Sequence, residues 1–204
     1  MLDVLMTIIY FNIRDPNGPK FQFPSILPTP RYMIAGERYA ASPEGMVAVM
    51  VNSEKVPIIS YAAWFEGETW KEFLEDTLSV MLGQLAKNVK FRNGHTGFQD
   101  QEVFVLGFHG LGFHIVRGFF TADVISRVQV NGCSVDDAFE LRFTRSYNLL
   151  FKQDWLEATR ALTRLLRYLQ SGESKVGAMQ AYLLERSDVA NSSCKTMEPK
   201  LDSS

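Results

Sequence analysis

Three arginines between residues 160 and 167 have the charge and the spacing to bind anions. Arg160, Arg164 and Arg167 share one face of residues 152–170, whose periodicity predicts an amphipathic helix. The opposite face carries the apolar side chains of Trp155, Leu162, Leu165, Leu166 and Leu169. Guanidinium groups bind phosphates and carboxylates, so this face could contact nucleic acid or an acidic protein. It could equally be a solvated face on which Glu157 pairs with Arg160.

The histidines and cysteines do not have the spacing of a metal site or of an activated nucleophile. His109 is expected in a turn and His114 in a strand, with no carboxylate or cysteine nearby at ligand spacing. Cys133 follows an Asn-Gly pair, and no partner base can be identified. Because Cys194 lies in a polar segment, both cysteines are expected to be reduced thiols.

Length and charge limit the classes of function. A chain of 204 residues predicts one domain. Its 21 basic and 23 acidic residues give a net charge of −2, which argues against a general attraction to nucleic acid or to anionic membranes but permits a local basic face. The apolar start is too short to span a bilayer and lacks the basic flank of a signal peptide. We expect an intracellular protein, cytoplasmic or nuclear, with no membrane partner.

Turn residues between apolar runs predict strands. Asn52-Ser-Glu-Lys55 is typical of a turn and separates residues 46–51 from 56–61, so a hairpin is expected there. A second hairpin is expected from strands at 102–107 and 112–117. Two further strands are predicted at residues 124–130 and 139–143.

Capping residues and helical periodicity predict the main helix. Thr69 and Glu72 fit a capping box, in which each side chain accepts a hydrogen bond from a free N–H group at a helix start. Apolar residues then recur at helical spacing, at Trp70, Leu74, Leu78, Met81, Leu85 and Val89. The helix is expected to reach about Lys90 and to stop at Asn93-Gly94. A last short helix is predicted over residues 174–186.

These elements predict a mixed α/β or α+β fold, with a central mixed sheet flanked by helices. Residues 1–13 could be a short helix or a strand, and residues 14–30 hold five of the eight prolines. We therefore expect an irregular, proline-rich N-terminal extension over residues 1–30. A single α/β domain should follow over residues 31–187, and a disordered tail over residues 188–204.

The order of hairpin, long helix and strand pair over residues 43–120 resembles the core of the PD-(D/E)XK, or restriction-endonuclease-like, nuclease superfamily. Pro43-Glu44 stands before the first strand, as Pro-Asp does in that family. Pro57-Ile-Ile-Ser-Tyr-Ala-Ala-Trp64 is similar to a strand that ends in Glu-Ala-Lys-Trp, and Gln84 lies in the helix, where the family often places a glutamine. The resemblance implies a restriction-endonuclease-like core with Glu44 and Gln84 as site residues. Residues 98–172 are also similar to uncharacterised fungal proteins.

The sequence departs from that family at the positions that carry its chemistry. Such nucleases need carboxylates to hold Mg²⁺ beside the scissile phosphate and a lysine to position the attacking water. Here Tyr61 and Ala63 occupy the matching places, and only Glu44 remains as an acid. Glu66 and Glu68 could restore a metal site from the following loop, or could simply be carboxylates favoured near a helix N-terminus.

Three functions remain open from the sequence. The first is a catalytically inactive binding or scaffold domain with a nuclease-like fold and no cofactor, whose partner is nucleic acid or protein. The second is a Mg²⁺-dependent nuclease with relocated ligands at Glu44, Glu66 and Glu68. The third is an intracellular protein-interaction domain without nuclease ancestry.

Overall fold

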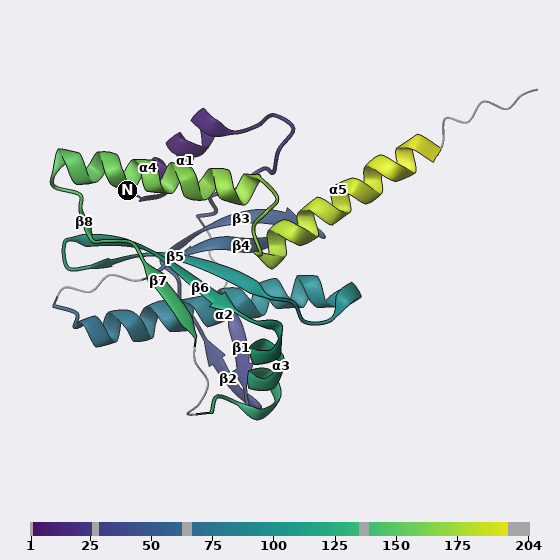
Figure 1. Cartoon of the computed structure of the whole chain (residues 1–204), viewed down its shortest axis with the longest axis horizontal. Coiled ribbons are helices and arrows are strands. Elements are labelled where there is room, and N and C mark those ends of the chain that lie inside the picture. The colour runs from purple at the N-terminus through teal and green to yellow at the C-terminus, as the bar shows by residue number, and fades with distance from the viewer. Residues whose placement is uncertain (1, 26–28, 63–66, 135–138, 196–204) are drawn as a thin grey trace, which may run out of the picture.

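The computed structural model describes residues 2–25, 29–62, 67–134 and 139–195. A mixed sheet lies at the centre of the molecule, with helices on both of its faces (Figure 1). Helices α1, α4 and α5 lie on one side of the sheet, and α2 lies on the other with α3 and a separate two-stranded ribbon (Figure 1). This arrangement confirms the predicted mixed fold of strands and helices, with a central mixed sheet flanked by helices.

The first predicted hairpin is present. Strands β3 (Gly45–Val51) and β4 (Glu54–Tyr61) pair in antiparallel register around a tight turn. Asn52 and Ser53 adopt positive φ angles of 48° and 63° in that turn. Most side chains of both strands are buried, as expected for strands covered by helices on two faces.

The second hairpin builds the other half of the sheet. Strands β5 (Gln101–His109) and β6 (Gly112–Phe120) pair along their whole length, which confirms the prediction. The predicted strand at 139–143 is β7 (Glu140–Phe143), which pairs with β6, as does the short β8 (Tyr147–Asn148). The order of the main path is β3-β4-β5-β6-β7.

The two hairpins meet along a short parallel seam between β4 and β5. The registered pairs of this seam are Ser60 with Val105 and Tyr61 with Leu106. A parallel pair requires a crossover connection, and helix α2 (Trp70–Thr96) provides it.

Asn88 of α2 connects β4 to the helix on the opposite face. Its amide nitrogen donates to the Pro57 carbonyl at 2.9 Å, and its amide oxygen accepts from the Ala178 N–H at 2.6 Å. Ala178 belongs to α5 (Gly177–Lys195), so helices from the two faces of the sheet meet at Asn88. Gly177 allows this approach, since a Cβ there would lie 2.9 Å from the Asn88 carbonyl oxygen.

The capping box at the start of α2 is present, with Thr69 and Glu72 in reciprocal hydrogen bonds. The predicted end of the helix is wrong. The helix passes Asn93-Gly94 and ends at Thr96, before Gly97, whose φ of 73° is in the left-handed region that favours glycine.

The face that α2 buries also differs from the predicted apolar stripe. Leu78, expected in the stripe, is only partly buried, as is Leu74. Over residues 70–91 of the helix, the buried residues are Phe73, Thr77, Val80, Met81, Gly83, Gln84, Leu85 and Asn88. The helix is rotated toward a row that includes polar residues, because Gln84 and Asn88 find hydrogen-bond partners on β4.

Helix α4 (Lys152–Gln170) confirms the predicted amphipathic helix. Its buried residues are Ala158, Leu162, Leu165, Leu166 and Leu169. α1 (Leu2–Ile13) packs against α4 on the same face of the sheet (Figure 1). None of the helices in the described ranges is both long and apolar enough to cross a membrane.

The N-terminal region departs from the irregular extension predicted over residues 1–30. Residues 2–13 form α1, in which Met6, Ile9 and Tyr10 are buried. The Tyr10 hydroxyl donates to the Pro19 carbonyl at 3.0 Å and accepts from the Phe21 N–H at 3.1 Å. This segment therefore belongs to the core. The sequence does not reveal this, because α1 is apolar on nearly all sides and shows no clear periodicity.

Residues 124–130, predicted as a strand, belong instead to helix α3 (Ala122–Asn131). The Thr121 hydroxyl caps the helix by accepting from the Val124 N–H at 3.4 Å. Ile125 and Val128 lie three residues apart and are both buried. Capping and this helical contact outweigh the β-propensity of the branched residues.

A ribbon that the sequence analysis does not predict completes the fold. β1 (Arg31–Ile34) and β2 (Glu37–Ala40) pair in antiparallel register apart from the main sheet. The ribbon packs beside α2 and α3 (Figure 1).

The C-terminal helix is longer than the predicted segment of 174–186. α5 extends to Lys195, so residues 188–195 of the predicted disordered tail are helical. Residues 196–204 lie outside the described residues.

Candidate functional site

The positions that the nuclease resemblance assigns to catalysis do not form an acidic cluster in the described residues. Glu44 is exposed just before β3, and its backbone N–H donates to the Tyr61 carbonyl at 3.0 Å. The Tyr61 side chain is buried against Gly45, where an added Cβ would lie 2.2 Å from its ring. Tyr61 is therefore a packing residue. Ala63 and Glu66 lie outside the described residues.

Gln84 has a structural partner. It is fully buried on α2, and its side-chain oxygen accepts a hydrogen bond from the Ser60 hydroxyl at 2.7 Å. Its amide nitrogen has no hydrogen-bond partner among the described residues. The side chain thus connects α2 to β4 at the parallel seam.

Glu68 lies partly buried in front of α2. One of its carboxylate oxygens has no hydrogen-bond partner within the described ranges. Burial raises the pKa of Glu68, the nearby carboxylates of Asp76 and Glu72 raise it further, and His109 opposes them. In the part of the chain that the structure describes, no group of three or more histidines, cysteines or acids could hold a metal ion. The described residues therefore do not supply the carboxylate set that Mg²⁺ would need here.

The arginine face of α4, made of Arg160, Arg164 and Arg167, points away from the core. All three side chains are exposed, and none takes part in an ion pair within the described ranges. A guanidinium that makes no ion pair can take an external phosphate or carboxylate without first breaking an internal one.

The predicted partner of Arg160 is already bound to another arginine. Arg145 contacts Glu157 at 2.5 Å and Asp154 at 2.8 Å, so the expected pair between Glu157 and Arg160 does not form. The Arg145 guanidinium holds the pKa of both carboxyl groups below its usual range. Arg145 thus offsets one of the two negative charges of this acidic pair and engages Glu157, so Arg160 is left without it.

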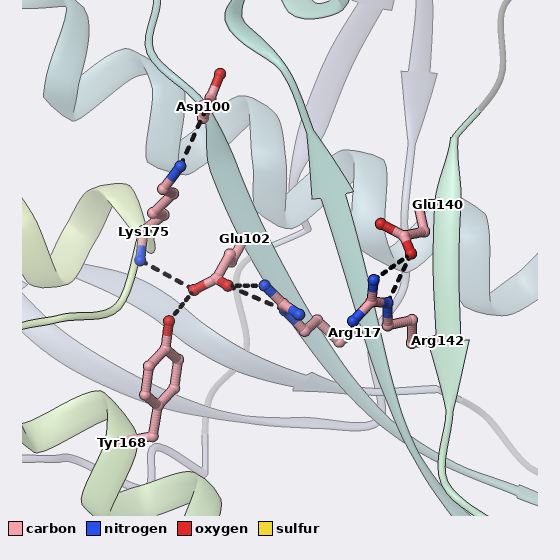
Figure 2. A network of polar contacts seen from close by, with 7 residues as sticks. All are labelled: Asp100, Glu102, Arg117, Glu140, Arg142, Tyr168 and Lys175. Atoms are coloured by element: carbon pink, nitrogen blue, oxygen red, sulfur yellow. Dashed lines mark hydrogen bonds and ion pairs between the residues drawn. The ribbon is translucent and has the colours of Figure 1, made fainter.

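A buried polar network centred on Glu102 lies on the same side of the sheet as α4 (Figure 2). The Glu102 carboxylate is 2% exposed. It accepts from the Arg117 guanidinium, from the Tyr168 hydroxyl at 2.6 Å and from the Lys175 backbone N–H at 3.0 Å. It joins β5 to β6, to α4 and to the segment before α5.

The donors around Glu102 determine its charge. Burial alone would raise the pKa of Glu102, but the hydrogen bonds from Tyr168, Lys175 and Arg117 together hold it below its usual range. Burial and the Glu102 carboxylate raise the pKa of Tyr168 to about 12, so its hydroxyl remains a donor at neutral pH. With both oxygens occupied, Glu102 acts as an internal clamp.

A surrounding layer of ion pairs is more exposed. The Lys175 ammonium lies 3.1 Å from Asp100, which also accepts from the Ala122 N–H at 3.1 Å (Figure 2). Arg142 of β7 pairs with Glu140 at 2.6 Å. Sequence reasoning missed the network, because its members become neighbours only through strand register and helix packing.

Comparisons of the chain with protein-family models, with curated proteins and with solved structures gave no match.

Proposed function

We propose that the protein is a non-catalytic binding module that contacts the phosphates of nucleic acid through the arginine face of α4. The observation that carries the proposal is the pairing of Arg145 with Glu157, which leaves Arg160 without its expected partner. Along the helix axis the three arginines are spaced by about 6 Å and 4.5 Å, so they present a row of charge and not a single point. The chain as a whole is slightly negative, so binding depends on this local face.

The nuclease-like fold remains part of this proposal. The order β3, β4, α2, β5, with β4 parallel to β5, supports the resemblance. The residue types argue against cleavage, since attack on a phosphodiester builds negative charge that a carboxylate-held metal usually stabilises. The exposed Glu44 and the buried Tyr61 do not make such a site.

The test is a binding titration with labelled single-stranded and duplex DNA and RNA at several salt concentrations. Affinity is expected to fall as salt rises, with a log–log slope near one per phosphate contacted. Replacing Arg160, Arg164 and Arg167 by glutamine should reduce both affinity and slope. The control replaces Arg38, Lys55 and Lys71, which are exposed on other elements and give the same change in net charge.

Two outcomes would contradict the proposal. An equal loss of affinity in the arginine-face variant and in the control variant would mean that no particular face binds the nucleic acid. Competition by polyglutamate as strong as that by nucleic acid would point to an acidic protein partner.

A second candidate function is a Mg²⁺-dependent nuclease with relocated ligands, favoured by the carboxylate oxygen of Glu68 that has no hydrogen-bond partner among the described residues. The same substrates incubated with Mg²⁺ distinguish it. We expect no cleavage. Cleavage that requires Mg²⁺ and disappears in Glu66→Ala or Glu68→Ala would favour the relocated site, and Glu44→Ala tests the remaining family position.

A further inference from the structure

An apolar cavity of about 340 Å³ lies between α2, α3 and the β1–β2 ribbon. Apolar side chains from both helices and from the end of β6 supply most of its wall, among them Leu82, Leu85, Val89, Phe120, Ile125 and Val128. This volume falls in the range of small-molecule sites, which are typically about 300–1,000 Å³, mostly apolar and preformed. The helices and the ribbon that line it lie on the opposite side of the sheet from α4 (Figure 1).

The ribbon packs closely against α2 at one end and against the C-terminal end of α3 at the other. At one end Gly83 of α2 lets Pro30 and Ala41 approach, since an added Cβ would lie 3.1 Å and 2.9 Å from their side chains. At the other end Gly132, with a φ of 80°, lies beneath Ala35, whose Cβ is 3.0 Å from the position that a Cβ would take. The ribbon therefore contacts α2 at one end and the residue that follows α3 at the other.

One rim of the cavity is cationic. Arg31 and Lys90 line it, and both also line a neighbouring cavity of about 300 Å³ together with Lys87. Glu54 forms ion pairs with both lysines, with Lys87 at 2.9 Å and with Lys90 at the longer distance of 3.9 Å. No ion pair of Arg31 occurs within the described ranges, and no acidic residue is among the described lining residues. An apolar chamber thus opens toward a positive rim.

We propose that this cavity binds a hydrophobic carboxylate, with its apolar body among the side chains of α2 and α3 and its carboxylate between Arg31 and Lys90. The apolar wall favours a chain or ring removed from water, and the rim favours an anion over a neutral head group. A guanidinium can hold a carboxylate through two parallel hydrogen bonds. The proposal does not depend on nucleic-acid binding by α4.

The experiment is isothermal titration of the full chain with decanoate, with decanol as the uncharged analogue and acetate as the head group alone. Decanoate should bind saturably, about tenfold or more tightly than decanol, because a hydrogen bond to a charged group is stronger than one to a neutral group. Acetate should show no saturable binding. Equal affinities for decanoate and decanol, or no saturable binding of decanoate, would overturn the proposal.

Variants locate the site. Val128→Trp should fill the cavity and weaken decanoate binding about tenfold or more, while Val130→Trp should not, because Val130 is 73% exposed on the same helix. Should Val128→Trp fail to fold, Met33→Trp at the rim, where Met33 is 52% exposed, tests the same occlusion. An equal loss from Val130→Trp would place the ligand elsewhere.

The charge is tested separately. Replacing Arg31 and Lys90 by glutamine should remove the preference for decanoate over decanol, and Arg38→Gln on the same ribbon should leave it unchanged. A preference that survives the double replacement would mean that the rim does not select the anion.

Discussion

At the scale of single residues, the Glu102 carboxylate is the best-defined polar feature of the molecule. It is 2% exposed, yet it is charged and fully hydrogen-bonded. A buried charge of this kind often adds little net stability over an apolar residue, but losing one of its partners is destabilising. Mutation of Glu102 is therefore expected to act through the groups that it leaves unsatisfied.

Glu102→Gln should lower the free energy of unfolding at pH 7 by about 2–3 kcal/mol, because charge-assisted hydrogen bonds are replaced by weaker ones. The folded state lowers the pKa of Glu102, so its contribution is present above the usual value of 4.5 and is lost as pH falls through the lower folded value. The difference between wild type and variant should therefore shrink below about pH 4.5. Denaturant titrations across this range measure it.

Glu140→Gln is the matched control, since its side chain is 54% exposed and also pairs with an arginine. Surface pairs contribute at most about 1 kcal/mol, so this variant should change little. If both variants gave the same loss, the assignment of Glu102 as the clamp would be wrong.

At the scale of elements, α2 carries a face that the apolar pattern alone misplaces. Leu85 is 8% exposed, whereas Leu78 lies at the margin of the buried face. The helix turns Gln84 and Asn88 inward because β4 and α5 offer them partners. Leu85, which is buried, therefore contributes more to stability than Leu78, which is only partly buried.

Leu85→Ala should destabilise the protein by about 2–5 kcal/mol, as for other buried leucines, and Leu78→Ala by clearly less. Arg164→Ala on the exposed face of α4 should change stability by less than about 1 kcal/mol. Urea denaturation of the three variants provides the comparison. A larger loss for Leu78→Ala than for Leu85→Ala would mean that the helix faces are assigned incorrectly.

At the scale of the whole molecule, α1 belongs to the same folded unit as the sheet. Met6 is fully buried on α1, while Val4 on the same helix is 61% exposed. Met6→Ala should reduce the free energy of unfolding by about 2–5 kcal/mol, and Val4→Ala should change it by less than about 0.5 kcal/mol. Thermal unfolding of the two variants measures the difference. If Met6→Ala left the stability unchanged, α1 would not belong to the folded unit.

The sequence predicts those elements whose signals are local. The Thr69–Glu72 capping box places the start of α2, and the turn at Asn52 places the first hairpin. α3 is mispredicted, because Val124 and Val130 favour a strand in isolation, whereas the Thr121 cap and the burial of Ile125 favour the helix. Local propensity yields to packing where the two disagree.

Of the candidate sites, too, only those with a local signal can be predicted from the sequence. The arginine face can be derived from helical spacing alone, because one helix carries all three side chains. The Glu102 clamp cannot, because Tyr168 and Lys175 are separated from it by 66 and 73 residues. The apolar cavity depends on how the β1–β2 ribbon packs against α2 and α3, and no local pattern in the sequence predicts that packing.

The short parallel seam between β4 and β5 has a consequence for the order of folding. Each hairpin is closed by a tight turn and can form within microseconds, whereas the seam requires the intervening α2 crossover to be in place. We expect the two hairpins to form early and the seam to close last. In native-state hydrogen exchange, the Ala62 amide, which donates to the Leu106 carbonyl at 2.8 Å, should then open at lower free energy than amides between β5 and β6. Equal protection would argue for a sheet that forms in a single step.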